Sequence, residues 1–216
     1  MKPIFFLLSI ALLVGCNQNS KEDQHDHYLD IPEIILTPLQ QQVHNQINDD
    51  WQTGLQVVKI DSILKTYVDS AFIATADSLE WKGQSNTHER IRKEFRYETF
   101  KIGTAYDFLI NMNDCTMGLM IAKDYNILSH MQSIDKYYQR LLGVLEGNQK
   151  ENLIKNQALW SESLKSDIEF SREMMGEHGT ETLYLDYTDR RHRLRFLYRC
   201  YEDAYINYLL SQDISL

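Results

Sequence analysis

Few side chains in this sequence of 216 residues have the types and spacing that covalent chemistry requires. Three are cysteines, Cys16, Cys115 and Cys200. A thiolate is a nucleophile and a metal ligand, yet the sequence contains no Cys-x-x-Cys, Gly-x-Ser-x-Gly or His-Glu-x-x-His motif and no phosphate-binding glycine loop. His178 and Glu181 could supply two metal ligands, but a polar loop explains them better. We therefore expect no catalytic residue, no metal and no cofactor, and Cys16 has the most specific setting.

Cys16 directly follows a short apolar segment with a basic start. Lys2 supplies the positive charge, and the run from Ile4 to Val14 is apolar except for Ser9. At about 1.5 Å per residue this run is too short to cross a hydrocarbon layer of ~30 Å, whereas a secretory signal has this pattern. The alternatives are a lipoprotein signal or a plain secretory signal followed by a chance cysteine.

The segment Leu13-Val14-Gly15-Cys16 resembles the lipobox of bacterial lipoproteins. The resemblance implies removal of residues 1–15 and a diacylglyceryl group on the Cys16 thiol. Such a lipid would anchor the protein, because several acyl chains hold a protein stably in a membrane. The resemblance predicts a protein anchored in the cell envelope, at the outer membrane. Residues 17–27 contain no apolar side chain, so we interpret 16–31 as a flexible tether. Lys21-Glu22-Asp23 also looks like a surface-export tag, which is the less favoured interpretation.

The mature chain is acidic and has few helix-breaking residues. Removing residues 1–15 leaves 21 basic and 31 acidic side chains, a net charge of −10 with histidine neutral. Such a charge argues against nucleic acid as a partner and favours a basic one. Three prolines, nine glycines and few alternating patterns predict a mostly helical protein. An exported chain meets an oxidising environment, so a disulfide between Cys115 and Cys200 is one possibility that sequence alone does not decide.

Helix signals recur along the chain and predict an all-α fold. Thr37-Pro38-Leu39-Gln40 reads as a capping box with proline at the first helical position, and Gly54 is a candidate break. Asn86 with Glu89 marks a second start. Three long helices follow: from 113 or 114 to near 147, from 148 to 176, and from about 181 to 210. Short connections between long helices imply antiparallel neighbours, so we expect an antiparallel helical bundle with additional N-terminal helices.

The second half resembles the LprI-type lysozyme-inhibitor family, whose members are exported and often lipid-anchored. The matching positions are Met112-Asn113-Asp114-Cys115, Tyr138 with Leu141 and Leu142, Gln157 with Trp160, and Thr188 with Arg191. The resemblance implies an LprI-like helical domain at 111–216 and a lysozyme as the partner. The helix signals before it predict a separate N-terminal helical region at 32–110. Lysozymes of the common animal type are basic, and steering by opposite charge would favour their encounter with an acidic domain.

The chain departs from the family pattern at two cysteines. The stretch Leu164–Ile168 lacks the expected Arg-Asp and cysteine, and Leu183 stands near the place of another cysteine. The resemblance then leaves Cys200 as the candidate partner of Cys115.

Two further patterns have competing interpretations. Thr87, Arg90, Arg92, Phe95 and Tyr97 reappear at a constant offset as Thr188, Arg191, Arg193, Phe196 and Tyr198, which a duplicated helical unit or chance could produce. The basic run Arg190–Arg199 could bind an anion, such as a lipid headgroup or glycan. We favour arginines that pair with acidic residues of neighbouring helices.

The sequence thus favours a lipid-anchored binding protein that blocks lysozyme through a projecting loop. The candidate loops are Gly147–Gln149 and Gly176–Gly179. The alternative is an interaction or immunity lipoprotein that binds another envelope protein, and an enzyme acting on cell-wall glycans is less expected.

Overall fold

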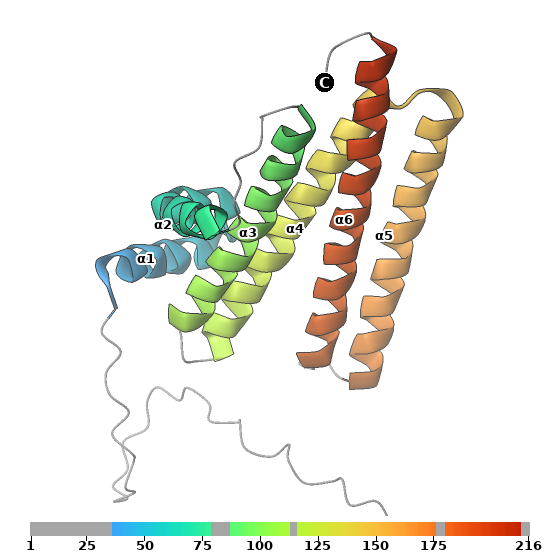
Figure 1. Cartoon of the computed structure of the whole chain (residues 1–216). Coiled ribbons are helices and arrows are strands. Elements are labelled where there is room, and N and C mark those ends of the chain that lie inside the picture. The colour runs from blue at the N-terminus through green and yellow to red at the C-terminus, as the bar shows by residue number, and fades with distance from the viewer. Residues whose placement is uncertain (1–35, 79–86, 113–115, 176–179, 213–216) are drawn as a thin grey trace, which may run out of the picture. The chain divides into compact units, whose positions relative to one another are not determined.

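The computed structural model describes residues 36–78, 87–112, 116–175 and 180–212. All regular secondary structure in these ranges is helical (Figure 1). There are six helices in the described part: α1 (Pro38–Thr53), α2 (Val57–Ser78), α3 (Thr87–Met112), α4 (Thr116–Val144), α5 (Gly147–Met175) and α6 (Thr180–Ser211). The predicted all-α class is therefore confirmed, and the helices belong to one compact unit, Leu36–Leu216. The signal, Cys16 and the tether lie outside the described residues.

The start of α1 follows the predicted capping box. The Gln40 backbone N–H donates to Thr37 Oγ1 at 3.2 Å, and the Thr37 N–H donates to Gln40 Oε1 at 2.9 Å. These two bonds satisfy backbone donors that a helix start otherwise leaves without partners. Gly54 ends the helix with φ 95°, a conformation that glycine adopts without steric cost.

Each helix packs against its neighbours in space through one apolar face. α1 packs on α2, α2 on α3 and α4, α3 on α4 and α6, and α5 on α6, while the most extensive contact joins α4 and α6. In Figure 1, α6 lies between α4 and α5. No helix among the described residues is both long and apolar enough to cross a membrane.

Two hydrophobic clusters form the core. The first core cluster joins α1–α4 and includes Ile60, Leu64, Leu109 and Tyr125. The second core cluster joins α3–α6 and is rich in aromatic rings: Phe95 stacks on Tyr198 with centroids 3.8 Å apart, and Tyr137 meets both Phe95 and Tyr198 edge-on. This aromatic contact fixes α3 beside α6, where the candidate site lies.

Candidate functional site

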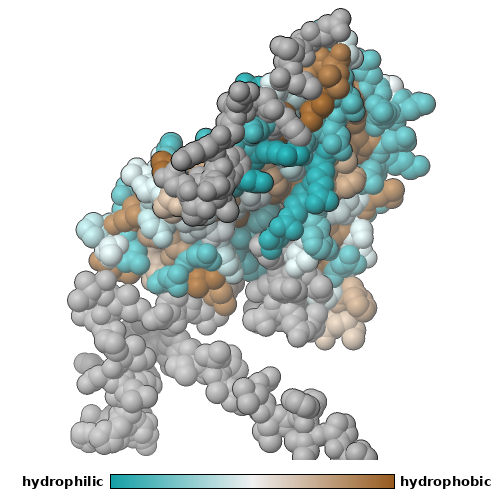
Figure 2. Space-filling model, viewed as in Figure 1, coloured by the Kyte–Doolittle hydropathy of each residue, from teal (hydrophilic) through white to brown (hydrophobic). Residues whose placement is uncertain are grey.

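Five arginines gather where α3 and α6 lie side by side. Arg92 and Arg96 come from α3, and Arg191, Arg195 and Arg199 come from α6. The three on α6 are spaced by four residues, which places them on one helix face. We call this surface, together with Phe95 between the two helices, the arginine groove. In Figure 2, strongly hydrophilic residues run across the part of the drawn face where α3, α4 and α6 lie in Figure 1.

One end of the arginine groove deepens into a cavity of about 510 Å³. Four helices line it: α2 with Phe72, α3 with Phe100 and Gly103, α4 with His130, and α6 with Leu194. Phe72 and Phe100 meet edge-on with centroids 5.3 Å apart. The interior is therefore largely aromatic and aliphatic.

Charge on the cavity lining has a single sign. Arg96, Arg191 and Arg195 line the cavity, and none of the described lining residues is acidic. Glu202 lies farther along the arginine groove, where it accepts a hydrogen bond from Arg92 Nε at 2.5 Å. Arg191, Arg195 and Arg199 form no ion pair with any described residue. The preferred interpretation of the basic run, arginines paired with acidic residues of neighbouring helices, is thus wrong for these three.

His130 contributes a polar group to the cavity lining. Its ring is buried, and Nδ1 lies 2.8 Å from the Asn126 carbonyl oxygen, to which it donates. Burial lowers the pKa of His130, and the positive charges of Arg191 and Arg190 lower it further. The imidazole therefore stays neutral and leaves the positive charge to the arginines.

Arg193 belongs to the same basic run but occupies a different, buried site. Its guanidinium donates to Asn156 Oδ1 at 2.7 Å and to Gln157 Oε1 at 3.0 and 2.5 Å. The Trp160 and Phe196 rings lie 5.3 and 5.2 Å from it. Arg193 is thus held by amide oxygens and aromatic faces, and the predicted pairing with acidic residues is wrong for it as well.

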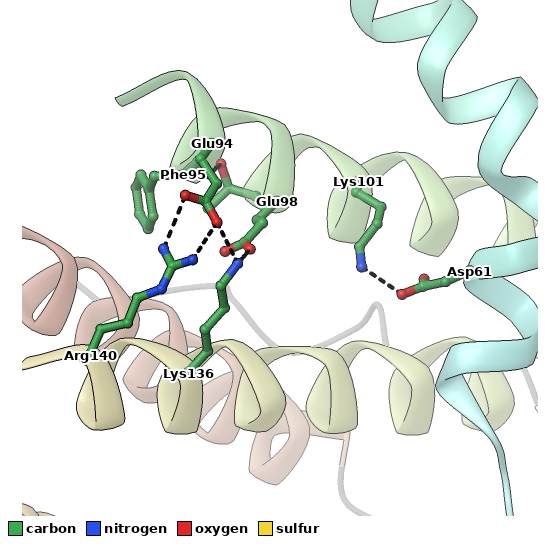
Figure 3. Close-up of polar contacts among 8 residues, drawn as sticks. Asp61, Glu94, Phe95, Glu98, Lys101, Lys136 and Arg140 are labelled. Carbon is green, nitrogen blue, oxygen red and sulfur yellow. Dashed lines mark hydrogen bonds and ion pairs between the residues drawn. The ribbon is translucent and has the colours of Figure 1, made fainter. Parts of the chain in front are cut away.

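A network of ion pairs fixes α3 on its neighbours (Figure 3). Arg140 of α4 donates to both carboxylate oxygens of Glu94, at 3.0 and 2.7 Å, and Lys136 donates to Glu94 and Glu98. The Arg140 hydrogen bonds, aided by Lys136, lower the pKa of Glu94 to about 2. These contacts pair Glu94 and Glu98 of α3 with cationic side chains of α4.

A second ion pair joins α2 to α3 and α4. Asp61 accepts hydrogen bonds from Lys101 Nζ, at 2.5 Å, and from the Tyr125 hydroxyl. Burial and the Asp61 charge raise the pKa of Tyr125, which keeps its hydroxyl a donor. The acidic residues in these networks are therefore engaged away from the arginine groove.

The positions that carry the family resemblance lie in several different parts of the structure. Gln157 and Trp160 meet at Arg193, and Tyr138 packs on the same second core cluster. Met112 is buried in the first core cluster, Thr188 is half buried, and Arg191 lines the cavity. Asn113 and Cys115 lie outside the described residues, as do the loop Gly176–Gly179 and His178.

The thiol of Cys200 is half buried on α6 and forms no disulfide among the described residues. Burial and the nearby Asp203 charge raise its pKa. Because Cys115 lies outside the described residues, the pairing of these two cysteines stays a prediction. No group of three or more histidine, cysteine, aspartate or glutamate side chains in the described ranges is placed to hold a metal ion.

Sequence reasoning missed the cavity because its lining comes from four helices. The periodic spacing of Arg191, Arg195 and Arg199 was the available signal, but the spacing does not reveal which residues face them. Arg96 and Phe100 of α3 and His130 of α4 are brought there by tertiary packing alone.

Comparison with protein-family models, with curated proteins and with solved structures returned no match to this chain.

Proposed function

We propose that this chain is a lipid-anchored, non-catalytic binding protein of the bacterial cell envelope, and that it binds and blocks a lysozyme. The observation that carries the proposal is the convergence of the family-motif positions Gln157 and Trp160 on Arg193. Both residues lie on α5, were singled out by their spacing, and contact one buried cation of α6. This supports the LprI-type resemblance, from which the lysozyme partner follows.

The finer arrangement that we propose is an antiparallel bundle with α4, α5 and α6 as its three C-terminal helices. Only Leu145 and Glu146 connect α4 to α5, and so short a connection favours antiparallel neighbours. Gly147 follows with φ 51°, a left-handed conformation that permits the tight reversal. Contacts from Glu94 to Arg140 and from Asp61 through Lys101 to Tyr125 support opposite directions for α3 and α4.

The charge distribution supports a basic partner that docks away from the arginine groove. Setting its five arginines aside leaves 16 basic and 31 acidic side chains in the mature chain, a net charge of −15. A basic lysozyme would be repelled by the arginine groove and attracted to the remaining surface. This attraction acts mainly on the rate of association and weakens as salt screens it.

The α4–α5 turn is the part of the described chain that we propose to enter the lysozyme cleft. Gly147, Asn148 and Gln149 are exposed in the first turn of α5. The cleft of a lysozyme works with two carboxyl groups, and the side-chain amides of Asn148 and Gln149 can donate hydrogen bonds to them.

The test is lysis of cell walls by several lysozyme types in the presence of the soluble chain from Asn17 onward, which keeps the whole Leu36–Leu216 unit. We expect slower lysis, with weaker inhibition as salt rises. The double variant Asn148→Ala/Gln149→Ala should inhibit less, whereas removing two exposed amides elsewhere, Gln132→Ala/Asn207→Ala, should change nothing. Undiminished lysis by every type at a large molar excess of the protein would refute the proposal.

The second candidate is a lipoprotein that binds another envelope protein. It is favoured by exposed apolar side chains on α5, since Leu159, Phe170 and Met174 share one helix face and are 56%, 63% and 69% exposed. Capture from envelope extracts with wild type and with Phe170→Ser would separate the candidates. A partner other than lysozyme that is lost in the variant supports this second function.

A further inference from the structure

The cavity at the deep end of the arginine groove has a cationic rim. Arg191 and Arg195 lie one turn apart on α6, and Arg96 of α3 lines the same cavity. Like charges one turn apart on a helix repel each other, and no described lining residue offsets them with a negative charge. A guanidinium donates two parallel hydrogen bonds to a carboxylate or phosphate. An anion bound at this rim would reduce the repulsion between Arg191 and Arg195 and accept hydrogen bonds from their guanidinium groups.

Beneath the rim the lining is apolar. Phe72, Phe95 and Phe100 contribute aromatic rings, and Ile102 and Leu194 contribute aliphatic side chains. The volume of about 510 Å³ lies within the range of ~300–1,000 Å³ that is usual for small-molecule sites. A small inorganic anion would use the arginines and leave this lining in contact with water. An attached apolar group would displace that water favourably.

We propose that the cavity binds an amphipathic anion, with a phosphate or carboxylate headgroup held by Arg96, Arg191 and Arg195 and an apolar chain or ring packed on Phe72, Phe95 and Phe100. This site is independent of the lysozyme partner proposed above, because it lies in the arginine groove, from which a basic protein is repelled. The ligand chemistry fits both a membrane lipid and a free organic anion.

Gly103 offers a direct way to test the apolar part of the site. It lines the cavity from α3, and a Cβ added there would meet no heavy atom within 4 Å. Gly103→Leu should therefore fill the cavity without removing a charge, and leucine is the better helix former. Gly143 of α4 is a matched control, because a Cβ there also meets open space and Gly143 does not line the cavity.

The experiment is calorimetric titration of the soluble chain from Asn17 onward with octyl phosphate, inorganic phosphate and octanol, below the concentration at which octyl phosphate forms micelles. We expect one octyl phosphate to bind per chain, at least about tenfold more tightly than inorganic phosphate or octanol. Only octyl phosphate can contact both the arginine rim and the apolar lining. No binding of octyl phosphate, or equal affinity for inorganic phosphate or octanol, would overturn the proposal.

The variants locate the binding. Arg191→Gln/Arg195→Gln and Gly103→Leu should each weaken octyl phosphate binding by about tenfold or more. Arg172→Gln, which removes an exposed arginine of α5, and Gly143→Leu should leave it unchanged. The thermal unfolding midpoint of Arg191→Gln/Arg195→Gln should not fall, because the change removes a repulsion. Full binding by Gly103→Leu or by the double arginine variant would overturn the proposal, whatever their stability.

Vesicles distinguish the two sources of ligand. If phosphatidylglycerol vesicles bind the wild-type chain and octyl phosphate displaces it, the ligand is a membrane lipid. If the vesicles do not compete while octyl phosphate still binds in the cavity, the ligand is a free organic anion. Both results support the cavity as an amphipathic-anion site. Vesicle binding that Gly103→Leu retains in full, together with no binding of octyl phosphate in the cavity, would contradict it.

Discussion

At the scale of single residues, the most informative side chain is Arg193, a buried cation with no carboxylate partner among the described residues. Its exposed fraction is 7%, and burial lowers its pKa. A buried charge needs hydrogen bonds or a π-face to offset lost hydration. Arg193 obtains both from α5, so the contact between α5 and α6 depends on it.

Removing the Gln157 amide should therefore destabilise the protein. Gln157→Ala leaves part of the Arg193 guanidinium without an acceptor, which should lower the free energy of unfolding by about 1–3 kcal/mol. Urea denaturation of the soluble chain measures this. The exposed Gln132→Ala is the control and should stay within about 0.5 kcal/mol of wild type. Equal stability of both variants would contradict the role assigned to Gln157.

His130 should make stability depend on pH near neutrality. The folded protein favours the neutral ring, while the unfolded chain binds a proton near the ordinary pKa of about 6.5. Its contribution is therefore present above about pH 6.5 and is lost as the pH falls below it. We expect the free energy of unfolding to decrease from pH 7.5 to 5.5, less steeply in His130→Gln. The exposed Gln132→Ala should keep the wild-type slope.

Arg193 also shows why sequence reasoning was incomplete at this scale. Periodic patterns treat charged residues as exposed, and nothing in the run Arg190–Arg199 distinguishes the buried arginine from the exposed ones. The distinction is made by Asn156, Gln157 and Trp160, which lie more than thirty residues away in the chain.

At the scale of elements, α3 is held in place by charge as well as by apolar packing. Glu94 accepts hydrogen bonds from Arg140 and Lys136 (Figure 3). Phe95, the next residue, stacks on Tyr198 in the second core cluster. The ion pairs orient α3 so that Arg92 and Arg96 lie beside α6. The arginine groove is thus a consequence of how α3 is fixed.

Glu94→Gln should weaken this attachment in a pH-dependent way. The pKa of Glu94 is lowered to about 2, so its contribution is present above about pH 4.5 and disappears as the pH falls towards 2. Because the carboxylate is partly exposed, we expect a loss of about 1 kcal/mol at pH 7. The difference between wild type and variant should vanish in acid. Glu169→Gln, in an exposed pair with Lys165 at 3.8 Å, should change stability by less than about 0.5 kcal/mol at either pH.

Element boundaries were largely predictable because they depend on local chemistry. The Thr37 capping box and the break at Gly54 are confirmed, and so is a last helix ending near Leu210. Burial was harder to predict on α4. Three of its apolar side chains are exposed: Met120, Leu128 and Met131. Three of its polar side chains are buried instead: Asn126, Ser129 and His130. Polar residues in a buried face escape a hydropathy pattern, since their partners come from other helices.

The suggested internal repeat is also an element-scale question. Phe95 lies in the second core cluster and Arg92 is half exposed, whereas their counterparts Phe196 and Arg193 are exposed and buried, respectively. The matching residues therefore have different environments, and the duplication stays a hypothesis.

At the scale of the whole molecule, the charges of the helical unit are segregated. Five arginines gather on one surface of a chain that is otherwise strongly acidic. A basic protein and an amphipathic anion would therefore bind at different places. This segregation could not be predicted from net charge alone, because it depends on α3 and α6 lying side by side.

The proposed lipid anchor at Cys16 can be tested in cells. Cys16→Ser removes the thiol that we propose carries the lipid, so the variant should move from the membrane fraction to the soluble fraction of cells. Fractionation and mass measurement of the mature protein check this. Lys21→Ser, which changes the tether without touching the thiol, should stay in the membrane fraction. Unchanged membrane association of Cys16→Ser would refute the lipoprotein interpretation.

We propose that the helical unit binds a lysozyme directly. The most direct test of this binding is calorimetric titration of a basic animal-type lysozyme with the soluble chain from Asn17 onward at low and at high salt. We expect a one-to-one complex at low salt that weakens as the salt screens the attraction between the acidic surface and the basic partner. Absence of binding at low salt, for this and for other lysozyme types, would contradict it.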